Sequence, residues 1–126
     1  MIVGMGIDLC EIARVRRSLA RFGERFMAKV LCEEEITYCQ RQGDVAQSFA
    51  GRFAAKEATV KALGGGQGLR WQDLQVLPAN DAPPQMLLLR HAKVRADAMG
   101  VDRVHLTITH DAGMALAFVI FESQRS

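Results

Sequence analysis

The segment from Ser48 to Gly68 constrains the fold more than any other stretch of this chain. It reads SFAGRFAAKEATVKALGGGQG, and the alanines at its centre favour an α-helix. The glycines from Gly64 to Gly66 predict the end of that helix, because glycine adopts the left-handed conformation that a helix exit requires. We therefore expect one helix from Ser48 to Leu63, about four turns long.

This helix carries charged side chains beside an apolar stripe. Phe49, Phe53 and Val60 share one side, and Glu57 and Lys61 follow at its edge. A partner can reach a carboxylate and an ammonium at that edge without full solvation. The alternative is an exposed Glu57–Lys61 pair, which contributes only about 0.2–0.5 kcal/mol to helix stability. This segment alone leaves both interpretations open.

Composition excludes several classes of protein. A length of 126 residues predicts one domain over residues 1–126, and 49% hydrophobic residues are typical of a globular chain. No apolar run reaches the roughly 20 residues of a membrane span, and the N-terminus lacks a signal-peptide pattern. The three cysteines have no CxxC spacing, so we expect reduced thiols and a cytoplasmic protein. A net charge of +2 is too small for a nucleic-acid polycation.

The N-terminal segment predicts a strand followed by an amphipathic helix. Ile2 to Leu9 is largely apolar and is interrupted by glycines, which in strands often mark the close approach of a backbone or a ligand. Asp8 stands at the end of this strand, either as part of a site or as an N-cap of the next helix. From Glu11 to Phe26, apolar residues recur at intervals of three and four, which predicts one continuous helix.

That predicted helix also carries a row of arginines on a second face: Arg14, Arg17, Arg21 and Arg25. Such a row is often only a solvated surface. Because Glu24 is the only opposite charge nearby, we favour a docking surface for an acidic partner.

The rest of the chain alternates short helices with strands. The acidic triplet Glu33–Glu35 opens a second predicted helix, Cys32–Gln42, where it suits the helix dipole without implying a site. Later patterns predict a loop and strand over 69–77, a turn over 78–84, a strand Gln85–Arg90, a helix His91–Met99, a half-buried strand over 104–109, a turn at His110–Asp111 and a strand Met114–Phe121. The expected fold is α+β, with helices packed on a small antiparallel sheet.

Two carboxylates, Asp8 and Glu57, are candidate metal ligands. Their spacing does not say that they meet, but if they do, they offer the oxygen donors that Mg²⁺ prefers. Lys61, Arg52 and Lys56 would then neutralise the charge of a phosphate ligand.

The glycines and a histidine are weaker candidates. Gly64 to Gly66 follow a helix C-terminus, where the dipole disfavours anions, so they are not a Walker loop. They either cap the helix or let a ligand approach the backbone. His110 is either an exposed polar residue or, when protonated, an anion ligand.

Three blocks together resemble a known family. GIDLCEIARV, GRFAAKEATVKALGGG and LTITHD are similar, in order and spacing, to the holo-acyl-carrier-protein synthases, the short and trimeric form of the 4′-phosphopantetheinyl transferases. The resemblance covers nearly the whole chain. The sequence departs from the family in the NDAP turn before Pro84 and in Thr107, where serine is common.

The resemblance implies roles for individual residues. Asp8 and Glu57 would bind Mg²⁺, and together with Lys61 they would be the catalytic residues. The coenzyme A contacts would be Phe49, Arg52, Phe53, Lys61, Gly64, Pro84, Thr109 and His110, with Thr109 and His110 coming from a neighbouring subunit of a homotrimer. Arg14, Arg21 and the rest of their row, Arg17 and Arg25, would dock the acidic helix of acyl carrier protein.

The implied reaction moves 4′-phosphopantetheine from coenzyme A to a serine of apo acyl carrier protein, with adenosine 3′,5′-bisphosphate as the second product, in fatty acid biosynthesis. It needs charge neutralisation on the pyrophosphate and a base for the serine proton. The sequence leaves open whether that base is Glu57 or a metal-bound water. One alternative is the same chemistry on a specialised carrier protein. Another is a non-catalytic binding module that uses its arginines for RNA or an acidic protein, although aromatic residues are not interleaved with the basic ones.

Overall fold

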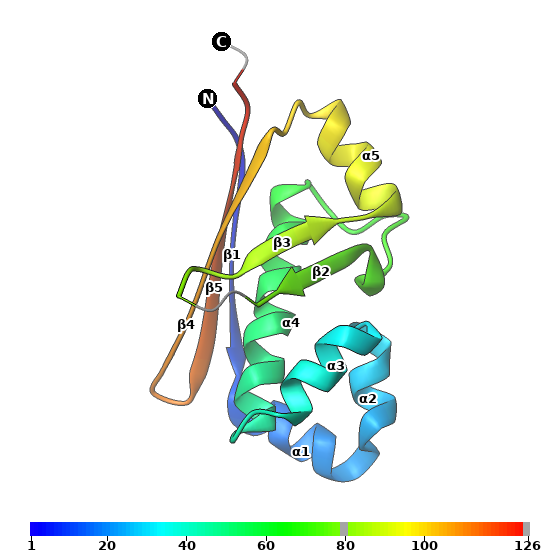
Figure 1. The fold of residues 1–126 in the computed structure, drawn as a ribbon, viewed down its shortest axis with the longest axis vertical. Helices are drawn as coiled ribbons and strands as arrows, with labels where there is room; N and C mark the ends of the chain where they lie inside the picture. Colours follow the sequence, from blue (N-terminus) through cyan, green and yellow to red (C-terminus); the bar gives the residue numbers. More distant parts are fainter. Residues whose placement is uncertain (79–80, 125–126) are drawn as a thin grey trace.

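A computed structural model of the chain describes residues 1–78 and 81–124. It confirms the α+β fold (Figure 1). The elements in chain order are β1 (Ile2–Glu11), α1 (Ile12–Phe22), α2 (Glu24–Val30), α3 (Glu33–Gln40), α4 (Val45–Ala62), the 3₁₀ turn η1 (Trp71–Asp73), β2 (Leu74–Leu77), β3 (Gln85–Leu88), α5 (Arg90–Ala98), β4 (Arg103–Asp111) and β5 (Met114–Glu122).

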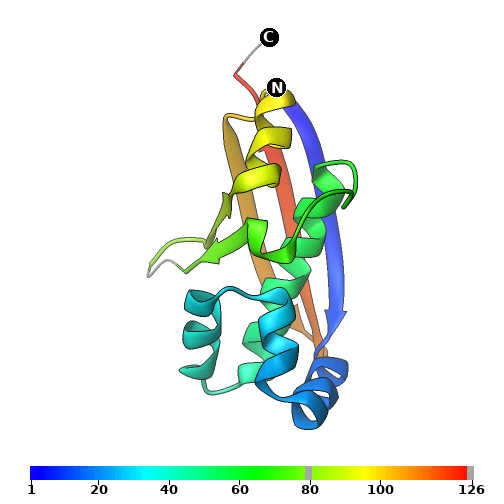
Figure 2. The same ribbon diagram turned by 90° about the vertical axis from the view of Figure 1, so that its right-hand side faces the viewer.

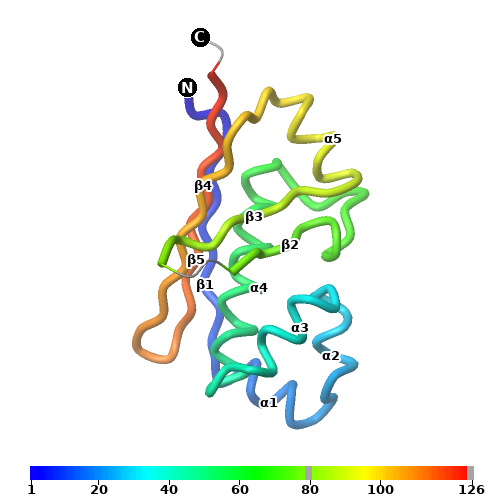
Figure 3. The backbone as a smooth tube through the Cα atoms, in the orientation of Figure 1, coloured from blue at the N-terminus to red at the C-terminus, as the bar shows by residue number. Residues whose placement is uncertain are grey.

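The main layer is an antiparallel sheet in the order β1-β5-β4, and β2 and β3 form a separate hairpin. All the helices lie on one side of the main sheet, with α4 against it (Figures 1 and 2). The two chain ends lie side by side at one end of the paired strands β1 and β5 (Figure 3), where the Met1 ammonium donates to the Ser123 carbonyl at 2.7 Å. The other face of the sheet is not covered by any element of the described chain.

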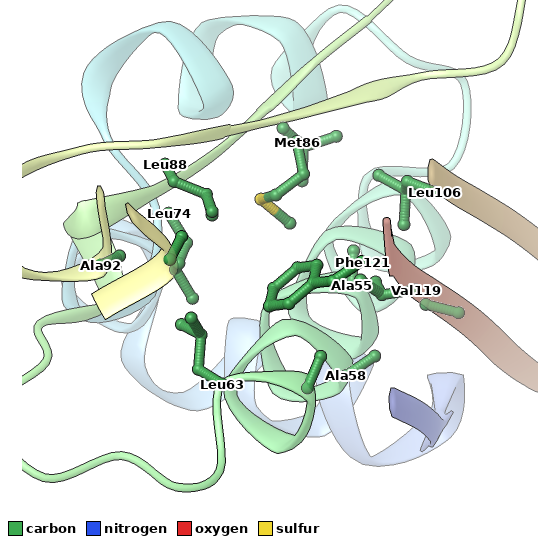
Figure 4. Packing of buried hydrophobic residues seen from close by; sticks show 14 of the residues in the cluster. Ala55, Ala58, Leu63, Leu74, Met86, Leu88, Ala92, Leu106, Val119 and Phe121 are labelled. Carbon is green, nitrogen blue, oxygen red and sulfur yellow. The ribbon is translucent and has the colours of Figure 1, made fainter. Parts of the chain in front are cut away.

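Helix α4 is buried on most sides because it lies between two apolar clusters. Ala55 and Ala58 pack with Leu106, Val119 and Phe121 of the sheet (Figure 4). A second cluster joins the first turns of α4 to α1, α2 and α3. Alanine side chains are small enough to let the helix approach the strands closely.

The glycines of β1 make that approach closer still, as the sequence predicted. A Cβ atom added to Gly6 would lie 1.8 Å from the Ala58 carbonyl oxygen, and one added to Gly4 would lie 2.7 Å from that of Ala62. Strand β1 and helix α4 are therefore in close backbone contact over about one turn of the helix, from Ala58 to Ala62.

The long helix predicted from Glu11 to Phe26 is wrong. The chain breaks at Gly23, whose φ of 62° and ψ of −142° are outside the helical region. The apolar spacing continues across the break because α1 and α2 both face the second cluster. Arg25 therefore lies on α2 rather than in one helical row with Arg14.

Two predicted strand ends are also wrong. Strand β1 continues to Glu11, so Asp8 lies inside it, opposite Ala117 of β5. Glu11 is the N-cap residue of α1 and makes no side-chain cap bond, so the capping role for Asp8 is excluded. His110 and Asp111 belong to β4, and the turn falls at Ala112 and Gly113, both with positive φ.

The other predicted ends of helices and strands agree with the structure to within a few residues. Helix α4 begins at Val45 rather than Ser48, because Asp44 caps it by accepting from the Gln47 amide at 3.0 Å. The glycine exit is confirmed, since Gly64 and Gly65 have φ of 90° and 132°. Part of the predicted turn over 78–84, residues 79 and 80, lies outside the described residues. Within the described residues, none of the helices has the length and apolar character to span a membrane.

The contact at Gly6 predicts a severe stability defect. Gly6→Ala should lower the free energy of unfolding by about 3 kcal/mol or more, because the new methyl group meets a helix backbone that cannot move without opening the core. Urea denaturation measures the change. Gly43→Ala is the matched control, since nothing lies within 4 Å of its Cβ position. Equal stability of the two variants would contradict this account.

Candidate functional site

Asp8 and Glu57 come together, although they are far apart in the sequence. The backbone contact between β1 and α4 brings the two carboxylates close enough for the charge of Asp8 to act on Glu57. The pKa of Glu57 is raised, first by burial and then by the negative charge of Asp8, while Lys61 lowers it. Within the described chain, Glu57 accepts no hydrogen bond, so its oxygens remain available to a ligand.

Lys61 joins this group by a contact that helix spacing does not predict. Its Nζ donates to Asp8 Oδ1 at 2.9 Å and to the Ile7 carbonyl at 3.0 Å. Among the described residues, Lys61 forms its ion pair with Asp8. The simple Glu57–Lys61 pair is therefore absent, and all three proposed catalytic side chains form one cluster.

The carboxylate pair suits a hard cation. Mg²⁺ is commonly held by one or two carboxylates together with substrate phosphates and water. The described residues contain no group of three or more His, Cys, Asp or Glu side chains arranged for a metal. Asp8 and Glu57 therefore fit Mg²⁺ only as partial ligands, with a phosphate-bearing substrate completing the shell.

Beside Glu57 lies a cavity of about 330 Å³, lined also by Val60, Leu69, Arg70 and Trp71. Sequence reasoning missed Arg70 and Trp71 as site residues. They lie beyond the glycines in a segment that has no helical or strand periodicity linking it to Glu57. Only the return of the chain after Gly68 brings them to the carboxylate.

Lys56 was expected to neutralise phosphate, and that expectation is wrong. Its side chain is fully buried, and its Nζ donates to Glu35 Oε1 and the Val30 carbonyl, both at 2.7 Å. Burial lowers the pKa of Lys56, and the Glu35 carboxylate opposes that effect. No ligand can reach this ammonium.

Arg52 lines a second cavity, of about 310 Å³, together with Thr109 and His110. Its guanidinium carbon lies 4.0 Å from the centre of the Tyr38 ring, and its Nη1 donates to Ser48 Oγ at 3.2 Å. Its Nε is buried and has no partner in the described chain. A guanidinium held in place at a cavity wall suits an anion such as a phosphate.

The two cavities are separate within one chain. Residues 52 and 57 point in directions about 140° apart around α4, at 100° per residue. The Arg52 cavity and the Glu57 cavity share no lining residue. The structure thus brings Thr109 and His110 to Arg52, but it does not bring them to the carboxylates of the same chain.

The two phenylalanines predicted to contact coenzyme A, Phe49 and Phe53, differ in their burial. Phe49 is fully buried between Phe26, at a ring-centre distance of 5.0 Å, and Phe53, at 6.2 Å. A direct coenzyme contact from Phe49 is therefore wrong for this conformation, because its ring is core. Phe53 is half-buried and, with Arg14 and Phe26, lines a small cavity of about 130 Å³.

Gly64 lies in a loop that Arg95 holds in place. Arg95 donates to the carbonyls of Leu63 and Gly65 at 2.6 and 2.7 Å, which satisfies the exposed end of α4. Pro84 stands directly before β3, and its contact with a coenzyme stays a prediction.

The arginines differ in their surroundings. Arg17 lies 3.6 Å from Glu11, and Arg21 lies over the Phe22 ring at 5.1 Å. Arg14 borders the Phe53 cavity. Arg16, outside the predicted row, pairs with Asp44 at 3.2 Å.

Comparison with known proteins decides the family. The family model described as the 4′-phosphopantetheinyl transferase superfamily matches residues 4–118. The chain belongs to this superfamily. A holo-[acyl-carrier-protein] synthase of Anaeromyxobacter sp. (strain K) is 49% identical over 97% of each chain, and one of Solibacter usitatus is 42% identical over 98% of this chain and all of its own. The predicted resemblance and the expectation of an enzyme are both confirmed.

Solved structures of holo-[acyl-carrier-protein] synthases resemble this chain over nearly its whole length. The holo-[acyl-carrier-protein] synthase of Neisseria meningitidis has a TM-score of 0.88 at 30% identity, covering 98% of this chain and 100% of its own. That of Helicobacter pylori, solved in complex with coenzyme A, has a TM-score of 0.80 at 33% identity, covering 94% and 99%.

Proposed function

We propose that this protein transfers 4′-phosphopantetheine from coenzyme A to a serine of apo acyl carrier protein in the presence of Mg²⁺, releasing adenosine 3′,5′-bisphosphate. The observation that carries the proposal is the cluster of Asp8, Glu57 and Lys61, two carboxylates and an ammonium on the scaffold of a phosphopantetheinyl transferase. The activity named for the similar synthases, and the coenzyme A bound to one of them, support it.

In this proposal Asp8 and Glu57 hold the metal, which when bound supplies charge neutralisation on the pyrophosphate. Lys61, beside the two carboxylates, contacts a phosphate oxygen. The Glu57 cavity admits the part of the coenzyme next to the scissile bond, and Val60, Leu69 and Trp71 exclude water from it. The acceptor serine enters from the side of α1.

The Arg52 cavity is proposed to take a second phosphate of the coenzyme, with Thr109 and His110. Because this cavity is separate from the carboxylates of the same chain, we infer that each complete site uses two protomers. A bridging ligand then meets the carboxylates of one protomer and the Arg52, Thr109 and His110 group of the next.

The uncovered face of the sheet supports such an assembly. Met5, Ile7 and Leu9 of β1 are exposed large apolar residues on one side of the strand. They lie opposite Ile120, Phe118 and Leu116 of β5, so the six side chains form a continuous apolar stripe. A stripe of this kind marks an interface, and we propose that it forms the contact of a homotrimer.

The carrier protein is proposed to dock beside α1. Arg14 and Arg21 supply positive charge, and the Phe53 cavity next to Arg14 offers an apolar recess. An acidic helix with apolar side chains fits this combination of charge and recess.

We further propose that the enzyme acts in fatty acid biosynthesis in the cytoplasm, where the free thiols of Cys10, Cys32 and Cys39 would stay reduced.

Glu57→Gln tests the reaction and its carboxylate together. The wild type, incubated with apo acyl carrier protein, coenzyme A and Mg²⁺, should add one phosphopantetheine group to the carrier, and a chelator should abolish the gain. Glu57→Gln should lower kcat/KM by about 10² or more, because a metal ligand is lost. Intact mass spectrometry reads the product, and circular dichroism confirms folding. Normal transfer by the variant would remove Glu57 from the site, and no transfer or coenzyme binding by the wild type would favour a non-catalytic module.

Charge reversal tests the docking surface. Arg14→Glu with Arg21→Glu should raise KM for the carrier protein about tenfold or more and leave KM for coenzyme A nearly unchanged, since only the carrier meets these arginines. Steady-state kinetics with each substrate varied in turn gives both constants. Lys93→Glu, on α5 and away from this surface, is the control. Equal effects on both substrates would refute the docking role.

Light scattering tests the assembly. The wild type should have a mass about three times the 13.9 kDa of one chain. Met5→Glu places a charge on the stripe at a side chain 57% exposed in one protomer, so it should lower both mass and activity. Val94→Glu, at a residue 65% exposed on α5, should change neither. A stable and active wild-type monomer would contradict shared sites.

A further inference from the structure

Lys61 occupies the carboxylate that the proposed function assigns to the metal. Its Nζ lies 2.9 Å from Asp8 Oδ1, and Asp8 accepts no other side-chain hydrogen bond among the described residues. The Asp8 side chain is only 17% exposed, whereas the Lys61 side chain that pairs with it is 54% exposed. Glu57, the second carboxylate, stands unpaired beside it.

Lys61 occupies one oxygen of Asp8, Oδ1, and a divalent cation on either oxygen of this carboxylate would stand close to the ammonium. Two positive centres within about 4 Å repel each other by several kcal/mol near a protein surface, where the effective dielectric is well below that of water. A metal on Asp8 and Glu57 therefore weakens the hold of Asp8 on Lys61 and favours its release.

Lys61 is able to leave. Its side chain is 54% exposed, and a lysine carries its charge on a flexible four-carbon stem. Among the described residues, the one other acceptor that it loses is the Ile7 carbonyl, at 3.0 Å. The anion that approaches the two carboxylates under the proposed function, a coenzyme pyrophosphate, offers it new acceptors.

We propose that Lys61 is an internal cation that exchanges with the metal. It neutralises Asp8 in the metal-free protein and is released to the coenzyme phosphates when a divalent cation takes the two carboxylates. This inference rests on the proposed function, and it adds a coupling between metal and coenzyme that the residue roles alone do not contain.

The exchange has a thermodynamic consequence. Binding of Mg²⁺ frees Lys61 for phosphate, and binding of phosphate draws Lys61 away from Asp8. Each ligand therefore strengthens the other by the same factor. Direct contact between metal and phosphate adds to this coupling, but the share carried by Lys61 disappears when its charge is removed.

Calorimetry of Mg²⁺ binding without coenzyme A measures the competition. Lys61→Met keeps the length of the side chain and removes the ammonium, so its Kd for Mg²⁺ should be about tenfold lower than that of the wild type. Lys93→Met is the matched control, because Lys93 forms a comparable pair with Asp97 at 2.6 Å on α5. The control should leave the Kd unchanged. Equal affinity of the wild type and Lys61→Met, or binding to neither, overturns the exchange.

Lysine Nζ resonances distinguish exchange from simple loss of a nearby charge. With ¹⁵N-labelled lysine, the Lys61 signal is assigned by its absence from Lys61→Met, and Asp8→Asn supplies the signal of unpaired Lys61. Saturation of the wild type with Mg²⁺ should move the Lys61 signal to the Asp8→Asn position, and added coenzyme A should move it again. A Lys61 signal that does not move at Mg²⁺ saturation overturns the proposal.

The result is separable from the transfer reaction. A Lys61 signal that responds to Mg²⁺ in a protein that transfers nothing supports the exchange and removes the proposed function. Transfer by a protein whose Lys61 signal does not move removes only the exchange.

Discussion

The geometry of the site depends on a buried ion pair between Lys56 of α4 and Glu35 of α3. Glu35 Oε1 accepts from Lys56 Nζ and from the Cys32 amide, and Oε2 accepts from the Val76 amide. Lys56 also donates to the carbonyls of Val30 and Trp71. One pair thereby joins α2, α3, α4, η1 and β2. Removing one partner of such a pair typically costs about 3–5 kcal/mol, because the other charge is left buried alone.

This pair sets the rotation of α4 about its axis, and the site follows from that rotation. With Lys56 directed into the core, Glu57 lies about 100° further round the helix. The contact of Gly6 with Ala58 fixes the opposite side of α4 against β1. Between these two restraints Glu57 and Lys61 face the edge of β1, where Asp8 stands. The neighbouring residues Lys56 and Glu57 therefore have different roles: Lys56 holds the helix in place, and Glu57 lines a cavity.

Much of the fold was predictable because its signals are local. Alanines and glycines mark α4, and alternation marks β4 and β5. The break at Gly23 was missed because apolar residues keep helical spacing on both sides of it. The burial of Lys56 was missed because its partner is 21 residues away, in an acidic triplet that the helix dipole already explained. The cluster of Asp8, Glu57 and Lys61 was reached through family resemblance, since no spacing rule joins a strand to a helix so far along the chain.

Separation of charge within one chain reconciles the proposed use of anionic ligands with a net charge of only +2. The three cations assigned to ligands stand in distinct places: Lys61 on Asp8, Arg52 over Tyr38, and Arg14 beside the Phe53 cavity. Each of these side chains is held in place by a carboxylate, an aromatic ring or an apolar wall. None of them therefore needs many further positive charges nearby in order to bind an anion. A ligand with phosphates at two ends can satisfy Lys61 and Arg52 together only by bridging different sides of α4. In the proposed trimer the two sides come from different protomers, so the apolar stripe that assembles the protein would also complete the site.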